Sequence, residues 1–124
     1  MTHTKTMTGA ELKVRLGGLG LPPSWFAAQM KVTMRTVVRW FDGDHVSAEV
    51  AAEVDRLGEQ TLDEMRAMID AAGDGHRVTL STYRTDGNVL SKHGSWPATW
   101  HRSLTFRVLE HLEAQGRDVI VEYR

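Results

Sequence analysis

Residues 23–41 read PSWFAAQMKVTMRTVVRWF, and this stretch contains two short helical patterns separated by a break. The prolines at positions 22 and 23 suit the start of a helix, because proline lacks only an N–H donor that would be unpaired there. Lys31 and Val32 interrupt the first helix, and Thr33 is a good N-cap for a second helix that ends near Phe41. The stretch therefore predicts two short helices joined by a tight turn.

The apolar residues of this stretch predict how the two helices pack. Helices joined by such a turn cross steeply, so the first needs a small residue at the contact and the second needs branched or aromatic residues facing inward. Ala27 supplies the small residue, and Val37 and Trp40 supply the inward positions. Of Trp25 and Phe26, one is expected in the core. The outward face of the second helix then carries Met34, Arg35, Val38 and Arg39.

The segment from 21 to 43 resembles the helix-turn-helix of the Cro/C1 family of phage and bacterial repressors. The residues that carry the resemblance are Ala27, Val32, Thr33, Thr36, Val37, Arg39, Trp40 and Gly43. With its flanking helices the resemblance covers residues 8–72 and implies a lambda-repressor-like domain. Two positions depart from the family pattern: Phe41 replaces a glutamate, and Lys31 replaces a glycine in the turn. A left-handed backbone at Lys31 would cost about 1 kcal/mol.

The resemblance implies a sequence-specific DNA-binding transcriptional regulator that is not an enzyme and needs no cofactor. Arg35 is the first candidate for base reading, because a guanidinium can donate twice to guanine. Met34 and Val38 would contact thymine methyl groups, and Arg39 fits either a base edge or the backbone. The expected phosphate contacts are Ser24, Lys31, Thr33 and Thr36, with Lys13 and Arg15 as longer-range candidates.

Helical patterns also flank this stretch on both sides. Residues 1–7 form an expected frayed leader in which Met7 is an alternative start, and Thr8 caps a short helix that ends at glycines 17, 18 and 20. Ser47 caps a much longer helix that runs to about Ala72. Its heptad-like stripe comprises Val50, Val54, Leu57, Thr61, Met65, Met68 and Ala72. We interpret this stripe as a dimer surface, with an internal core seam as the alternative.

The glycines at 73 and 75 mark the expected boundary between a first domain, 8–72, and a second, 76–124. The second domain contains an alternating strand pattern at 78–84, a polar loop at 85–95, a helix at 97–115 and a β-branched strand at 119–123. We therefore expect a mainly α protein with a small α+β C-terminal part. Trp96 and Trp100 are expected to pack in its core.

This order of elements resembles the dimerisation unit of small anti-CRISPR-associated autorepressors. The resemblance implies a homodimeric repressor that binds double-stranded DNA at a palindromic operator, an inverted repeat in its own promoter. The residues expected at the dimer interface are Val54, Leu57, Met65, Met68, Val119 and Val121. An antitoxin whose C-terminal unit binds a toxin remains an alternative.

The amino-acid composition indicates which classes of protein the chain can belong to. The 124 residues are 41% hydrophobic and 25% charged, which is typical of one soluble globular domain or two very small ones. The absence of cysteine favours a reducing compartment and excludes thiolate catalysis and cysteine-ligated metals. Apolar runs are short and no signal pattern opens the chain, so we expect a cytoplasmic protein that does not enter a membrane.

Charge is distributed unevenly, although the net charge is only −1. Residues 1–46 carry six basic and three acidic side chains, whereas the remainder carries nine basic and thirteen acidic ones. A cationic front with an anionic rear indicates that any contact with a polyanion is made by the N-terminal third.

The sequence contains few signs of a metal site or of an enzyme active site. No two of the six histidines are spaced i, i+4, and no cysteine assists them, so no metal site is expected. A small nucleic-acid enzyme is the alternative of a different class. Its candidate groups would be Asp86, His93, His101, Arg102, Glu110 and Asp118. They form no evident nucleophile–base pair.

Overall fold

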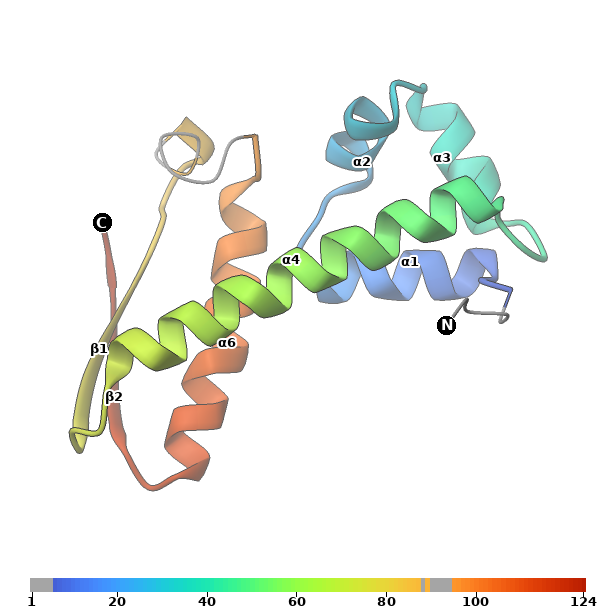
Figure 1. Cartoon of the computed structure of the whole chain (residues 1–124). Coiled ribbons are helices and arrows are strands. Elements are labelled where there is room, and N and C mark those ends of the chain that lie inside the picture. Colours follow the sequence, from blue (N-terminus) through green and yellow to red (C-terminus); the bar gives the residue numbers. More distant parts are fainter. Residues whose placement is uncertain (1–5, 88, 90–94) are drawn as a thin grey trace. The chain divides into compact units, whose positions relative to one another are not determined.

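The computed structural model describes residues 6–87, 89 and 95–124 of the chain, and the elements discussed below lie in these ranges (Figure 1). The protein is mainly helical, with a two-stranded parallel sheet in its C-terminal part. Two compact units divide the chain, Met1–Gly58 and Glu59–Arg124. The division falls inside the long helix α4 (Ala48–Ala72) and not at the glycine turn after it, because the second half of α4 packs against strand residues of the second unit.

The first unit contains α1 (Gly9–Gly18), α2 (Pro23–Met30), α3 (Met34–Phe41) and the first part of α4. Side-chain caps begin three of these helices, as the sequence predicts. The hydroxyl oxygen of Thr8 accepts from the Glu11 N–H at 3.0 Å, and that of Thr33 accepts from the Thr36 N–H at 3.2 Å. The Ser47 hydroxyl accepts from the Val50 N–H at 3.2 Å. These bonds satisfy N–H groups that the first helical turn leaves unpaired.

The core of the first unit is built from all four helices and the segments between them. Its buried apolar residues include Leu12, Leu16, Leu21, Phe26, Ala27, Val37, Val46, Val50, Val54 and Leu57. Val54 and Leu57 are expected at a dimer surface from the sequence, but they are 1% and 0% exposed within their own chain. These two residues therefore belong to the core, because the apolar stripe of α4 is already covered here.

The N-terminus of α1 approaches the C-terminal end of α3 very closely. The Gly9 N–H donates to the Gly43 carbonyl at 3.1 Å, and the Val46 N–H donates to the Met7 carbonyl at 2.8 Å. A Cβ atom on Gly9 would lie 2.5 Å from the Phe41 carbonyl oxygen and closer still to that of Trp40. Only glycine fits this position, which the sequence pattern did not indicate.

The second unit places α6 (Ala98–Ala114) between β1 (Arg77–Thr82) and β2 (Asp118–Tyr123) along the chain. The strands pair in parallel, with Val78 opposite Val119 and Leu80 opposite Val121. The predicted strand, helix and strand are confirmed, although the sequence did not predict how the strands pair. The expected loop at 85–95 is wrong in part, since residues 86, 87 and 89 are helical, and residues 88 and 90–94 lie outside the described residues.

The core of the second unit is a cluster of β1 and α6 residues, Val78, Leu80, Val108 and Leu112. Residues packed against it are Met65, Met68, Ile69, Ala72, Leu109 and Val119. Met65 and Met68 thus serve as a core seam in their own chain, which was the alternative interpretation of the stripe. Both side chains are only partly buried by these contacts, so their expected part in a dimer surface stays a prediction. Val121 is 40% exposed and does not belong to this cluster.

Candidate nucleic-acid interface

The connection between α2 and α3 is a tight turn with a left-handed residue. Lys31 adopts φ 59° and ψ 43°, and it is the only non-glycine residue with positive φ in the described part of the chain. The N–H of Lys31 donates to the Ala28 carbonyl at 3.2 Å, and that of Val32 donates to the Ala27 carbonyl at 2.9 Å. Such bonds close the C-terminus of a helix around a left-handed residue. The strained lysine expected from the sequence is therefore present.

We expect Lys31→Gly to raise the free energy of unfolding by about 1 kcal/mol, because glycine adopts this conformation without a Cβ penalty. Urea denaturation followed by circular dichroism measures the change. Lys31→Ala is the matched control, since it removes the same charge but keeps the Cβ, and it should bring no such gain. Equal stabilisation by both variants would assign the effect to the lysine side chain and not to the backbone.

The contact between α2 and α3 buries one face of each helix. Phe26 and Val37 are completely buried, and Ala27 is 4% exposed. The rings of Phe26 and Trp40 meet edge to face, with centroids 6.2 Å apart. Trp25 is only half-buried, so Phe26 is the aromatic residue of α2 that occupies the core. The inward positions therefore hold α3 in a fixed rotation about its axis.

That rotation leaves the opposite face of α3 open. Met34 is 43% exposed and Val38 is 48% exposed, and Arg35 and Arg39 are exposed beside them. Neither guanidinium forms an ion pair with any carboxylate of the described residues. The face thus combines two unpaired cations with two apolar side chains on one helix of eight residues.

The predicted phosphate-binding residues surround this face, and the structure gives them different surroundings. Ser24 is exposed near the start of α2, and Lys31 is exposed in the turn. The hydroxyls of Thr33 and Thr36 lie 3.0 Å apart at the N-terminus of α3, where they hydrogen-bond to each other. The partial positive charge of a helix N-terminus would add to any anion contact there.

The two longer-range candidates for phosphate contact, Lys13 and Arg15, each have a partner inside the protein. The Lys13 ammonium lies 5.8 Å from the centroid of the Phe41 ring, a cation–π arrangement. The Phe41 ring therefore supports a nearby positive charge. The Arg15 guanidinium donates to the Glu11 carboxylate at 2.7 Å, so its charge is already paired.

Glu53 anchors α2 to the first part of α4. Its carboxylate accepts from the Gln29 amide at 3.1 Å and from the Arg56 guanidinium at 2.7 Å. The hydrogen bond from Arg56, assisted by that from Gln29, holds the pKa of Glu53 below its ordinary value of 4.5, although burial opposes the shift. The ionised carboxylate thus helps to fix the helix that supports α3.

Since the folded state lowers the pKa of Glu53, its contribution to stability is present above pH 4.5 and is lost as the pH falls through the folded pKa. We expect Glu53→Gln to lower the free energy of unfolding by about 0.5 kcal/mol at pH 7 and by less at pH 3. Urea denaturation at the two pH values measures the difference. The exposed Glu59→Gln on the same helix is the control. A loss as large at pH 3 as at pH 7 would show that the carboxylate charge is not responsible.

The polar residues of the second unit take part in separate local contacts. His101 is 1% exposed, and its Nδ1 lies 2.8 Å from the Thr82 hydroxyl. An Asp86 carboxylate oxygen accepts from the Ala98 N–H at 2.8 Å and caps α6, a role the sequence did not predict. Arg102 donates to two backbone carbonyls, and Asp118 pairs with Arg77. Glu110 is exposed, and His93 lies outside the described residues.

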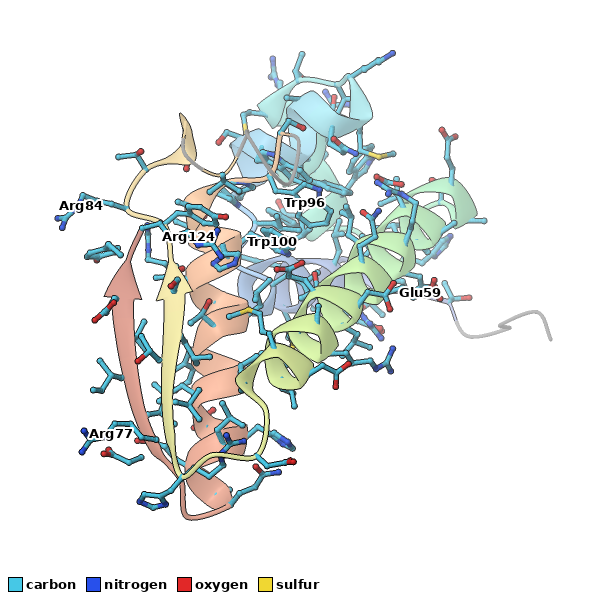
Figure 2. All side chains as sticks on the ribbon, turned by 60° about the vertical axis from the view of Figure 1, so that its left-hand side comes forward. Glu59, Arg77, Arg84, Trp96, Trp100 and Arg124 are labelled. Carbon is cyan, nitrogen blue, oxygen red and sulfur yellow. The ribbon has the colours of Figure 1, made fainter. Side chains whose placement is uncertain are left out.

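Among the described residues, Asp86, His101, Arg102 and Asp118 are thus engaged in different local contacts. Trp96 and Trp100 lie side by side at the start of α6, with ring centroids 4.3 Å apart (Figure 2). The indole N–H of Trp100 donates to the buried Thr61 hydroxyl at 2.9 Å. Trp100 is therefore buried, as expected from the sequence, but it lies outside the cluster around Val78 and Leu80, and Trp96 is only half-buried.

The described ranges hold no group of three or more His, Asp or Glu side chains arranged to bind a metal ion. None of the helices in these ranges combines the length and the apolar character that crossing a bilayer requires.

The exposed face of α3 is the feature that the geometry singles out. The α2–turn–α3 unit fixes its direction, and residues 1–46, to which it belongs, carry six basic and three acidic side chains. Comparison with known proteins gives no match, either to a protein-family model or to a curated protein.

Proposed function

We propose that this protein is a sequence-specific DNA-binding transcriptional regulator that inserts α3 into the major groove of double-stranded DNA. The observation that carries the proposal is the division of α3 into two faces. Val37 is fully buried, while Met34, Arg35 and Val38 are exposed, and Arg35 has no carboxylate partner among the residues that the structure describes. A helix held on one side and open on the other matches what a recognition helix needs.

The composition of the exposed face supports DNA over other partners. Arginine donates in pairs to guanine O6 and N7, and apolar side chains contact the thymine methyl group, so the face can read base edges of both kinds. Ser24, Lys31 and the N-terminus of α3 lie beside it as donors for phosphate oxygens. The resemblance to Cro/C1 repressors in the sequence of this segment points to the same function.

We further propose that the protein acts as a homodimer on an inverted repeat and represses transcription by occupying the promoter. Two recognition helices related by a two-fold axis would reach half-sites about 34 Å apart, or a multiple of this distance. Within the second unit, Val121 is the expected interface residue that remains well exposed, so the proposal assigns dimerisation to the surface around it.

The experiment that tests the proposal is selection of binding sites from a pool of random DNA duplexes. The full-length protein should enrich a palindromic sequence and bind it at least about a thousandfold more tightly than unrelated DNA. Equal affinity for selected and scrambled duplexes would contradict sequence-specific regulation. No measurable binding to any duplex at low salt would contradict DNA binding altogether.

Affinity for the selected duplex should also fall steeply with salt concentration, because cationic side chains release counterions from DNA phosphates. We expect the logarithm of the binding constant to fall linearly with the logarithm of the salt concentration, with a slope of about −0.9 for each phosphate contacted. Fluorescence anisotropy between 50 and 200 mM salt (the range over which such losses are large) measures it. A flat dependence would contradict the electrostatic part of the proposal.

A further inference from the structure

The outer edge of β2 carries backbone groups that pair with no strand in the described part of the chain. The N–H groups of Asp118 and Arg124 donate to the His76 and Thr82 carbonyls at 2.9 Å, so they point toward β1. Since these groups alternate in direction along a strand, those of residues 119, 121 and 123 point to the opposite side. An open edge of this kind accepts a further strand unless charge, proline or a covering segment prevents it.

Several apolar side chains of β2 are also exposed to solvent. Ile120 is 46% exposed, Val121 40% and Tyr123 53%, whereas the matching positions of β1 are mostly buried. On the side facing α6, an open groove of about 360 Å³ lies between β2 and the helix. Phe106 of α6, 57% exposed, lines it with Val121 and Tyr123. Figure 2 shows β2 as the outer strand with α6 behind the sheet.

We propose that a second copy of this chain adds its own β2 to this edge, antiparallel, with Val121 opposite Val121 of the other copy. The two sheets would then form one continuous four-stranded sheet around a two-fold axis. The inference rests on the proposed homodimer for its occupant and adds the surface and the register of pairing. An isologous contact of this type needs a self-complementary strand, and the sequence of β2 meets that requirement.

Charge selects the register. In the pairing centred on Val121, Asp118 of each copy lies opposite Arg124 of the other, and Ile120 lies opposite Glu122. Opposite charges directly across two strands stabilise a sheet, and like charges destabilise it.

The neighbouring registers that keep the same side chains facing α6 are less favourable. Centring the pair on Ile120 sets Asp118 against Glu122 twice, and centring it on Glu122 sets that carboxylate against its own copy. Centring it on Val119 leaves most of β2 unpaired. Registers shifted by one residue would turn the apolar face of one strand toward solvent.

The favoured register also gives hydrogen-bond partners to the outward backbone groups of β2, and it covers the groove beside α6. Val119 lies opposite Tyr123 of the other copy, so every outward N–H and C=O of residues 119, 121 and 123 gains a partner. The inward side chains of the added strand extend the apolar layer past Val121 toward Phe106. The exposed apolar surface of both copies is removed from water in one contact.

The absence of cysteine in the chain allows a direct test by disulfide formation. Residues in a non-hydrogen-bonded antiparallel pair have Cα atoms about 4.5 Å apart, which suits a disulfide. Ile120→Cys and Glu122→Cys are therefore made in full-length chains with different tags and co-expressed. Under mild oxidation we expect a covalent heterodimer from the mixture and no covalent homodimer from either variant alone.

Each other outcome has a defined meaning. A covalent homodimer of Ile120→Cys alone would overturn the register, because that residue would then lie opposite itself. No covalent dimer in the mixture would overturn the proposed surface. Sedimentation of the parent protein would then show either a monomer or a dimer, and a dimer would have to form through another interface. Thr79→Cys with Glu122→Cys is the control, since Thr79 lies on β1 away from the open edge. Binding of the selected duplex, measured on the same proteins, separates this result from a failure of the proposed function.

Discussion

Replacing Gly9 with alanine is expected to destabilise the protein by about 3 kcal/mol, although alanine normally stabilises a helix relative to glycine. The added Cβ would meet three backbone carbonyl oxygens at the end of α3, including that of Gly43 at 2.7 Å. Backbone oxygens cannot rotate away as a side chain can, so α1 would have to move. The hydrogen bond from Gly9 to Gly43 would be lost with that movement.

Gly17→Ala is the matched control for this prediction. Gly17 lies in the same helix, and a Cβ there would meet nothing within 4 Å. The control should raise the free energy of unfolding by about 0.5 to 1 kcal/mol, the usual gain from glycine to alanine. Urea denaturation of both variants measures the contrast. Similar stabilities for the two variants would show that α1 and α3 do not approach as closely as described here.

Arg35→Ala is expected to weaken binding to the selected duplex by about 1 to 3 kcal/mol per half-site, or roughly fivefold to 150-fold. Arg35 is exposed near the N-terminal end of α3, and the end of a recognition helix that enters the groove first is its N-terminal end. Losing a guanidinium that donates twice to one base removes discrimination at that base pair. Affinity for a panel of single-base variants of the duplex measures both effects.

The control for Arg35 removes an equal charge from another surface. Arg66 is exposed on α4 in the second unit and pairs with the exposed Asp63 at 3.4 Å. Arg66→Ala should leave the base preference and most of the affinity unchanged. If Arg35→Ala weakened binding to all duplexes equally, Arg35 would contact phosphate and not a base. If it had no effect on any duplex, α3 would not be the recognition helix.

Local chemistry made most helix and strand positions predictable from the sequence. Thr8, Thr33 and Ser47 each cap the helix that follows them, since a hydroxyl there pairs an N–H group that the helix leaves open. The turn at Lys31 was likewise evident from the break in helical pattern, and its left-handed conformation follows from closing α2. The outward face of α3 was predicted by periodicity, because one side of a helix must be buried.

The interpretation of the α4 stripe shows where periodicity stops being sufficient. Val54, Leu57, Met65 and Met68 form an apolar seam in either a core or a dimer, and the sequence alone does not say which chain covers it. In the structure Val54 and Leu57 lie in the first core, and Met65 and Met68 pack on the second. The division of the chain at Gly58 follows from this change of partner within one helix.

The sequence by itself determined the order of the long elements, the caps of α1, α3 and α4 and the exposed cationic face of α3, because each depends on residues close together in the chain. Only the tertiary structure decided that the strands pair in parallel, that Asp86 caps α6 and that Gly9 must lack a side chain. These features depend on groups distant in sequence that meet only when the chain packs. The sequence pattern indicates which side chains must be buried. Tertiary packing determines which other residues cover them.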